Sequence, residues 1–288
     1  MIRSFRRSWG YTRMSLRVLN RCPRLLVFPI LQDLFLVLLV GGFLFWIHTT
    51  QGFEAWLATD ESGEREAGFY IALGVVGLAG YLIYFFFRAA LVAGTFRYLG
   101  GEKALIGGAL ADSVRVFPQI FGWAAAATTV GHLVRLVEKN RTGRAWLGRL
   151  LDTAWKALTY LVIPIIVVER RGPIGAVRRS GELLRVKWGS ALIGNFSVGF
   201  FAFLLTIPVF LLAAFLFYLG FHASTAQGAI VTIACGLVVA VVGLSFDSAL
   251  NNIFRAVLYT YSTGQPLPGA IQDRHASLEE AFRSRRFR

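Results

Sequence analysis

VVERRGPIGAVRRSGELLRVKWG, residues 167–189, carries six basic side chains between two long apolar runs. Pro173 suits the first turn of a helix. Small or apolar residues then follow at helical steps of three and four: Ile174, Val177, Gly181, Leu184 and Trp188,. A basic face combined with an apolar stripe and a tryptophan is typical of a helix that lies in the headgroup layer of a membrane.

Apolar runs recur along the whole chain. They lie near residues 25–47, 69–87, 118–134, 147–168, 190–221 and 228–250. Most of them reach the roughly 20 residues that a helix needs to cross a ~30 Å hydrocarbon core. The chain also combines 56% hydrophobic residues with a net charge of +14, which is rare in soluble domains. We therefore expect an all-α, polytopic integral membrane protein with six transmembrane helices in a single domain, residues 1–265, followed by a basic cytoplasmic tail, residues 266–288.

The basic residues flank these runs and predict the orientation of the protein. Basic amphipathic interfacial helices are expected near residues 2–20, 107–117 and 173–188,. Residues 1–24 hold seven arginines and no acid, whereas residues 48–68 hold one arginine and five acids. Since cytoplasmic loops carry the excess of Lys and Arg, the sequence predicts a plasma-membrane protein with both termini in the cytoplasm.

One loop conflicts with six spans. Residues 135–149 carry five basic residues, yet six spans would place them outside the cell. The segment 118–168 therefore has two interpretations. It forms two full spans, or it forms a re-entrant hairpin that returns to the cytoplasmic side, which requires its non-helical turn to be buried in protein or water.

A short repeat follows the second, fourth and sixth expected spans. Its members are Gly108-Ala109-Leu110, Gly175-Ala176-Val177 and Gly269-Ala270-Ile271. In addition, FRAAL at residues 87–91 and FRAVL at residues 254–258 place Arg88 and Arg255 at equivalent inner ends of two spans. The sequence thus predicts a unit of one interfacial helix and one two-span hairpin, repeated three times.

Two segments resemble a known family. They are SWGYTRMSLRVLNRCPRLLVFPIL near the start and a motif that runs from Pro164 to Trp188 through Glu169, Gly172, Ala176, Arg179, Ser180 and Leu184. They resemble an uncharacterised prokaryotic family of six-span membrane proteins. The second motif is also similar to one in the membrane domains of some glycerophosphodiester phosphodiesterases. The resemblance implies a helical membrane domain and no established activity.

Charged residues inside apolar runs are the strongest candidates for a functional site, because such residues are unfavourable in lipid unless paired or wetted. The candidate intramembrane polar site comprises Arg88, Asp152, Lys156, Asp247, Asn251 and Arg255. Asp152 and Lys156 are four residues apart, so they can also simply pair with each other. Asp247, Asn251 and Arg255 form a stripe that is either the inner interface or a buried site facing Arg88.

A second set of candidates lies in the opening stretch. The candidate lipid-headgroup contacts are Arg178, Arg179, Ser180, Arg185, Lys187 and Trp188. Basic residues in short segments beside membrane spans favour anionic inner-leaflet lipids as partners, with other membrane proteins as further partners and no nucleic acid.

The motif content points away from an enzyme. No phosphate-binding loop of the form GxxxxGK[ST], GxSxG elbow, HExxH pair or CxxC pair occurs,. We expect a non-enzymatic membrane protein that acts through lipid or membrane-protein contacts, without a metal or cofactor. A transporter or channel with a polar intramembrane path is the alternative, and a lipid-modifying enzyme is the third hypothesis.

Overall fold

The computed structural model describes residues 2–50, 67–102, 105–139, 145–187 and 192–264, and all regular secondary structure within them is helical. In chain order the helices are α1 (Ile2–Arg21), the 3-10 helix η1 (Pro23–Leu26), α2 (Val27–Thr50), α4 (Ala67–Leu99), α5 (Ile106–Arg115), α6 (Phe117–Lys139), α7 (Ala145–Leu158), α8 (Val162–Glu169), α9 (Pro173–Lys187), α10 (Leu192–Phe221) and α11 (Ala226–Thr263). The expected all-α fold class is confirmed.

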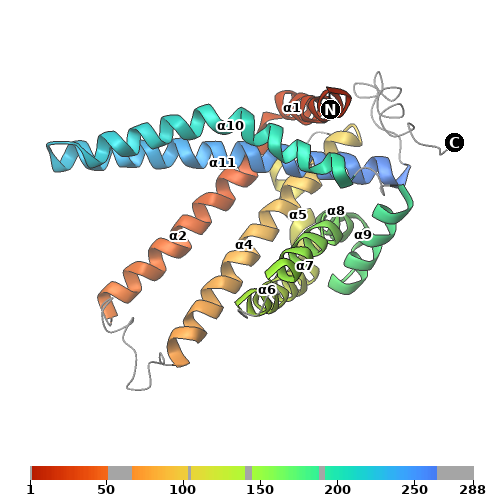
Figure 1. The fold of residues 1–288 in the computed structure, drawn as a ribbon, viewed down its shortest axis with the longest axis horizontal. Coiled ribbons are helices and arrows are strands. Elements are labelled where there is room, and N and C mark those ends of the chain that lie inside the picture. Colours follow the sequence, from red (N-terminus) through yellow and green to blue (C-terminus); the bar gives the residue numbers. More distant parts are fainter. Residues whose placement is uncertain (1, 51–66, 103–104, 140–144, 188–191, 265–288) are drawn as a thin grey trace.

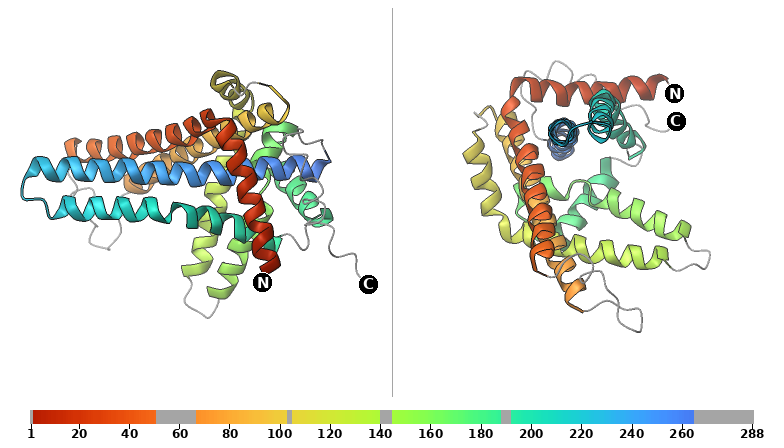
Figure 2. Two further views of the ribbon diagram at one scale, coloured as in Figure 1. Left: turned by 90° about the horizontal axis from the view of Figure 1, so that it is seen from above. Right: turned by 90° about the vertical axis from the view of Figure 1, so that its left-hand side faces the viewer.

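Three helical hairpins diverge from one packed region (Figures 1 and 2). They are formed by α2 with α4, by α6 with α7, and by α10 with α11. A shorter helix precedes each hairpin: α1, α5 and α9, respectively. α5 packs against the long helix α4, α9 packs against the short helix α8, and α1 packs against α10 and α11. The order of elements agrees with the threefold unit that the sequence predicts.

Four helical segments are long and apolar enough to cross a membrane. They are Pro23–Thr50, Gly68–Leu99, Phe203–Phe221 and Ala226–Thr263. Large apolar side chains on them face outward, with 63% of Val75 and 62% of Val238 exposed. Exposed apolar surface of this extent is stable only where something apolar covers it. These four candidate transmembrane helices indicate a membrane location.

The other two expected spans do not meet these criteria within the described residues. The run at residues 118–134 lies in α6, where polar residues dilute the apolar ones. The run at residues 147–168 is interrupted by a turn at residues 159–161, which divides it into α7, of 14 residues, and α8, of 8 residues. Neither piece alone reaches the ~20 residues needed to cross the hydrocarbon core. The expectation of six spans is therefore corrected to four candidate spans.

α4 and α11 change their surroundings along their length. Before Arg88 and Ser248 their side chains are mostly outward-facing, whereas beyond these residues Ala89, Val92 and Leu250 have no measurable exposure. The buried ends of the two helices join η1, α1, α5, α8 and α9 in two apolar clusters. We call this packed region the base, and the parts of α2, α4, α10 and α11 outside it the distal hairpins.

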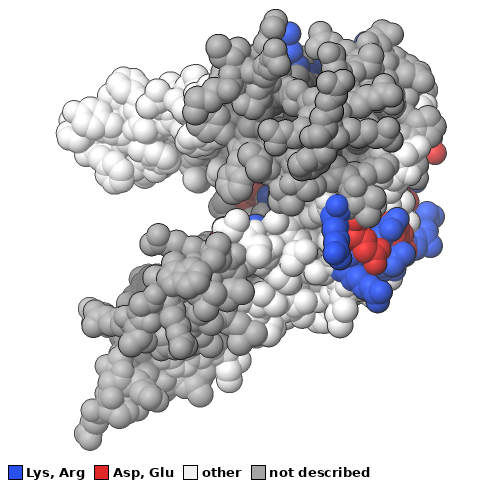
Figure 3. Space-filling view, turned by 45° about the vertical axis from the view of Figure 1, so that its right-hand side comes forward, with Lys and Arg blue, Asp and Glu red and all other residues white. Residues whose placement is uncertain are grey.

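The charged side chains follow the same division. The largest group of Lys, Arg, Asp and Glu in this view lies at the end of the molecule where α9 lies, and the described part of the arm formed by α10 and α11 presents none of them (Figure 3). Since lipid tails disfavour charge, this distribution assigns the charged base to an aqueous or headgroup environment.

Candidate functional site

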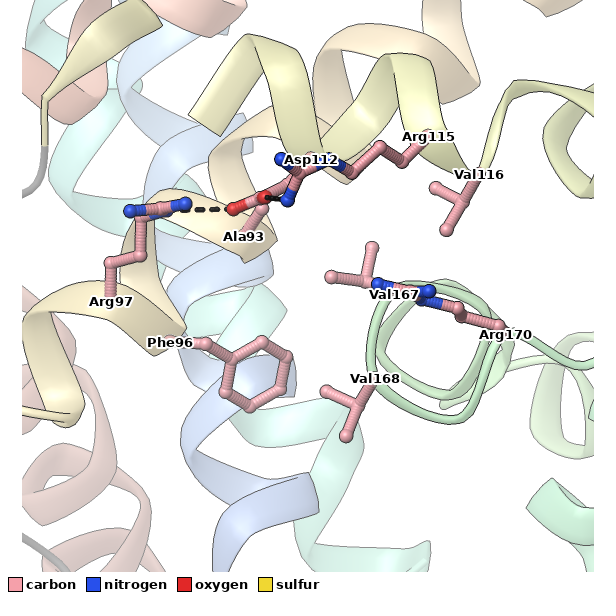
Figure 4. A pocket seen from close by; sticks show the side chains of 9 residues that line it. All are labelled: Ala93, Phe96, Arg97, Asp112, Arg115, Val116, Val167, Val168 and Arg170. Atoms are coloured by element: carbon pink, nitrogen blue, oxygen red, sulfur yellow. Dashed lines mark hydrogen bonds and ion pairs between the residues drawn. The ribbon is translucent and has the colours of Figure 1, made fainter. Parts of the chain in front are cut away.

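A pocket of about 170 Å³ opens in the base where the ends of α4, α5 and α8 meet (Figure 4). Its lining consists of Ala93, Phe96, Arg97, Asp112, Arg115, Val116, Val167, Val168 and Arg170. Five of these residues are apolar and form the floor, while three arginines and one aspartate form the polar part. The pocket thus combines positive charge with an apolar surface.

Asp112 holds two of the arginines in place. Its Oδ2 atom accepts a hydrogen bond from Arg97 Nε at 2.7 Å, and its Oδ1 atom lies 3.3 Å from Arg115 NH1. Arg97 also pairs with Glu102 at 3.0 Å. The Arg115 side chain is 65% exposed, so it retains donors for a ligand in addition to its contact with Asp112.

Arg170 enters the pocket from the opposite side (Figure 4). It ends α8 with φ 51°, the left-handed conformation, and its N–H donates to Ile166 O. It is the one residue other than glycine with a positive φ in the described chain. A side chain in this conformation is unusual, and here the turn directs Arg170 toward the space that Arg115 also faces.

A second group of ion pairs lies on the other side of α8. Glu169, whose side chain is 17% exposed, accepts hydrogen bonds from Arg179 Nε at 3.1 Å and from the Tyr259 hydroxyl at 2.9 Å, and pairs with Arg171 at 2.6 Å. Burial acts to raise the pKa of Glu169, but the hydrogen bonds from Tyr259 and Arg179 and the charges of Arg179 and Arg171 outweigh it, so the pKa lies below its ordinary value. Glu169 therefore joins α8, α9 and α11 as a carboxylate.

The two groups of ion pairs occupy equivalent positions of the repeat. Asp112 follows Gly108 by four residues, and Arg179 follows Gly175 by four. Each pairs with an oppositely charged residue at the end of the preceding long segment, Arg97 or Glu169. In both copies an ion pair therefore joins the short helix to the end of the helix that precedes it. The acidic residue lies on the short helix in the first copy and on the preceding helix in the second. The third copy, at Gly269, lies outside the described residues.

The alanine of the repeat is buried in both described copies. Ala109 and Ala176 are completely buried, and so are Ser113 and Ser180, four residues further along each helix. These small side chains let α5 and α9 approach their neighbours closely. The motif from Pro164 to Trp188 therefore holds α8 and α9 together through Ala176, Ser180 and the pair Glu169–Arg179.

The structure distributes the expected headgroup contacts over different roles. Ser180 is buried, and its Oγ accepts a hydrogen bond from Leu161 N at 3.3 Å. Arg179 is held by Glu169 and Glu182. Arg178 is exposed and pairs with Glu182, and Arg185 is also exposed. The side chain of Lys187 and all of Trp188 lie outside the described residues.

The buried face of α9 differs from the expected apolar stripe. Ile174 is 87% exposed, and the buried positions are Ala176, Ser180, Leu183 and Leu184. The expected stripe and the observed face share Leu184, but the observed face also contains Ala176, Ser180 and Leu183, which the stripe left out. The sequence interpretation also missed Arg97, Arg115 and Arg170, which are far apart in the sequence. The signal for them was the Gly108 repeat, which marks where α5 packs on α4.

The candidate intramembrane site is assembled in part. Asp152 and Lys156 pair with each other at 2.6 Å on α7, with side-chain exposures of 37% and 74%, and lie apart from the rest. Asn251 donates to Asp247 Oδ2 at 3.1 Å. Arg88 lies within electrostatic range of Asp247, Asp33 and Arg255, and no ion pair joins Arg88 to Asp247 among the described contacts. The residues of α4 and α11 therefore do come together.

Comparison with known proteins places the chain in a family. No curated protein and no solved structure matches it. In the part of the chain that the structure describes, no three His, Cys, Asp or Glu side chains gather as a metal site would require. The family model that matches is described as "Family of unknown function (DUF6159)" and covers residues 67–266, which include the pocket, the motif from Pro164 to Trp188 and the parts of the base that follow α2. The chain therefore belongs to the family of unknown function DUF6159.

Proposed function

We propose that this protein acts by binding rather than by catalysis, and that its base binds anionic phospholipid headgroups at the cytoplasmic face of the plasma membrane. The observation that carries the proposal is the pocket between α4, α5 and α8, where three arginines surround an apolar floor. Other membrane proteins that share the same lipid layer are further partners.

The chemistry of the pocket fits a phosphate with an apolar tail. The lining carries three positive charges and one negative charge. Guanidinium groups bind phosphate oxygens through charge-assisted hydrogen bonds. Each basic group near an anionic membrane surface adds roughly 1 kcal/mol of attraction. The apolar floor, which includes Phe96 and Val168, suits the glycerol backbone and the first carbons of an acyl chain.

The arrangement of the helices supports a headgroup position for the pocket. Arg97 lies near the end of the candidate span Gly68–Leu99, nine residues beyond Arg88, where α4 is already part of the base. α1 crosses the direction of α10 and α11 (Figure 2), as a helix lying in the membrane plane would. Lipids beside the distal hairpins would therefore present their phosphates at the level of Arg115 and Arg170.

We further propose that α6 and α7 remain on the cytoplasmic side. With four spans, the N-terminal segment, residues 100–191 and the C-terminal tail share one side of the membrane. The basic loop 135–149 then lies with the other basic segments, and the acidic loop 48–68 lies opposite, in accord with the positive-inside rule. The hairpin also runs across the direction of α10 and α11 (Figure 2). A cysteine at position 141 should resist an impermeant reagent in sealed cells and react after permeabilisation; reaction in sealed cells would contradict this topology.

Lipid retention tests the proposed binding function. The protein is released from mixed micelles that hold equal amounts of phosphatidylglycerol and phosphatidylcholine, and the retained lipid is counted by native mass spectrometry. We expect the wild type to retain phosphatidylglycerol. The double variant Arg115→Gln/Arg170→Gln should bind it at least about tenfold more weakly, because hydrogen bonds to charged groups contribute roughly 1.5–3 kcal/mol each.

The matched control is Arg17→Gln/Arg21→Gln. It removes the same two charges from exposed positions of α1, so a general loss of positive charge affects both variants equally. Retention in the control together with loss in the pocket variant supports the proposal. Equal loss in both variants, or equal retention, would contradict it.

A further inference from the structure

We propose a second anion site inside the helix bundle, in which Arg88 of α4 and Arg255 of α11 together bind a phosphate-class oxyanion. It is separate from the pocket at Arg115 and Arg170, and it rests on different observations. The first is that each guanidinium group lies over a tyrosine ring, and the second is that each has an unpaired donor. The third is that the neighbouring carboxylates bond to other residues.

Each of the two arginines lies over a tyrosine ring, which comes from the same helix for Arg88 and from the turn after α7 for Arg255. Arg88 lies over the ring of Tyr84 at 3.8 Å, and Arg255 lies over the ring of Tyr160 at 4.7 Å. Each ring stabilises the cation through its π face and leaves the edge of the guanidinium, where its N–H groups point, for another partner. The FRAAL and FRAVL segments thus place two oriented cations at equivalent positions.

Both arginines retain a buried donor without an acceptor. The Nε atoms of Arg88 and Arg255 are inaccessible to solvent and make no hydrogen bond among the described residues. A buried unpaired donor on a charged group is unfavourable by more than the 1–3 kcal/mol of a neutral one. The amide oxygen Gln32 Oε1 is also unpaired, but it carries no full charge, so the two guanidinium groups determine the class of ligand.

The nearby carboxylates do not supply the missing acceptors. Asp33 accepts hydrogen bonds from Ser245 at 2.7 Å and from Gln32 at 3.1 Å, and Asp247 accepts one from Asn251. Both carboxylates act on Arg88 through space, while neutral donors bond to both oxygens of Asp33 and to Oδ2 of Asp247. An anion between the arginines would complete their hydrogen bonds and offset the repulsion that Arg255 exerts on Arg88.

The site lies at the inner edge of the apolar layer. Arg88 follows Gly68 by 20 residues and Asp247 follows Ala226 by 21, so both lie about 30 Å from the far end of their helices at a rise of about 1.5 Å per residue. This matches the thickness of the hydrocarbon core. A lipid phosphate and free inorganic phosphate both reach this depth, and both provide the required oxyanion.

Ligand-dependent thermal unfolding tests the site. The protein is prepared in a phospholipid-free non-ionic detergent and carries Arg115→Gln/Arg170→Gln, so the pocket described above contributes nothing. Inorganic phosphate is added against chloride at equal ionic strength, and phosphatidylglycerol is added separately. We expect at least one of them to raise the Tm. A response to inorganic phosphate identifies the free anion as a ligand, and a response to the lipid alone identifies the headgroup.

Four further variants in this background, one of them a control, decide the assignment. Arg88→Gln and Arg255→Gln should each weaken binding of the effective ligand at least about tenfold, and the exposed control Arg17→Gln on α1 should leave it unchanged. Asp247→Asn removes a nearby negative charge while keeping an acceptor for Asn251, and should tighten binding several-fold. This gain remains informative if an arginine variant does not fold. No response to either ligand, a response that survives in both arginine variants, or no gain in Asp247→Asn would overturn the proposal.

Discussion

The two halves of α11 have similar residues and opposite surroundings. In the distal half, Leu244 is 52% exposed and Val238 is 62% exposed, whereas in the base Leu250 and Ile253 have no exposed surface. Protein covers the second set, whereas the first is exposed apolar surface on a candidate membrane span. The comparison teaches that an apolar helix can leave the membrane and continue into a packed core without a change in its composition.

The largest expected difference between the halves comes from truncating leucines. Leu250→Ala leaves a cavity in the base and should lower the free energy of unfolding by about 3 kcal/mol. Leu244→Ala, six residues earlier on the same helix, exposes a surface that lipid or detergent fills, and should change it by less than about 1 kcal/mol. Thermal or denaturant unfolding in detergent micelles measures both. Equal effects would show that the two positions share one environment.

A smaller difference is expected for glycines of α4. A Cβ atom at Gly94 would lie 2.9 Å from Leu25 Cδ2, whereas a Cβ atom at Gly77 would meet nothing within 4 Å. Gly94→Ala should therefore destabilise the protein by about 1–2 kcal/mol through overpacking of the base. Gly77→Ala should be neutral or slightly stabilising, since alanine favours the helix. The same unfolding assay compares them, and a stable Gly94→Ala variant would argue against tight packing between α4 and η1.

The polar contacts of the base should respond to pH. The folded pKa of Glu169 lies below its ordinary value of 4.5, so its contribution is fully present above pH 4.5 and is lost as the pH falls through the folded pKa. Glu169→Gln should cost about 2 kcal/mol at neutral pH and should flatten the loss of stability in acid. Unfolding midpoints measured from pH 7 to pH 3 test this. An unchanged acid profile in the variant would assign the pH dependence to other groups.

The smallest effect is expected at the ion pair outside the base. Lys156 and Asp152 form an exposed pair within one helix, and pairs of this kind contribute about 0.3–0.5 kcal/mol. Lys156→Ala should therefore change the unfolding midpoint far less than Glu169→Gln does. A comparable drop of the unfolding midpoint in the two variants would indicate that the Asp152–Lys156 pair belongs to a closely packed contact between α7 and another element.

The sequence predicted the helices well because apolar runs and basic flanks are local signals. The pair Asp152–Lys156 was expected from four-residue spacing, and the structure contains it. The same spacing predicted that Asp247 and Asn251 lie on one stripe of their helix, and Asn251 donates a hydrogen bond to Asp247. Pro173 was expected in the first turn of its helix and begins α9. These features depend on residues within one or two turns of each other.

The remaining features depend on contacts between distant segments. Hydropathy alone did not distinguish the outward-facing candidate span in α11 from α8, which is equally apolar but packed inside the protein, with Ile165 and Ile166 fully buried. The pocket joins Arg97, Asp112 and Arg170 across three helices. The contact between Ser245 and Asp33 spans 212 residues. Neither the spacing of apolar residues nor a motif within one segment can predict contacts between segments so far apart in the sequence.

The central claim is that α4 and α11 pass from lipid into a protein-packed base near Arg88 and Asp247. Spin labels placed singly from Val238 to Tyr259, in a chain whose Cys22 and Cys235 are replaced, test it in liposomes through their collision rate with molecular oxygen. We predict high rates with a helical period up to Asp247 and low rates at every position from Ala249 onward. High, periodic oxygen accessibility that continues to Tyr259 would contradict the claim.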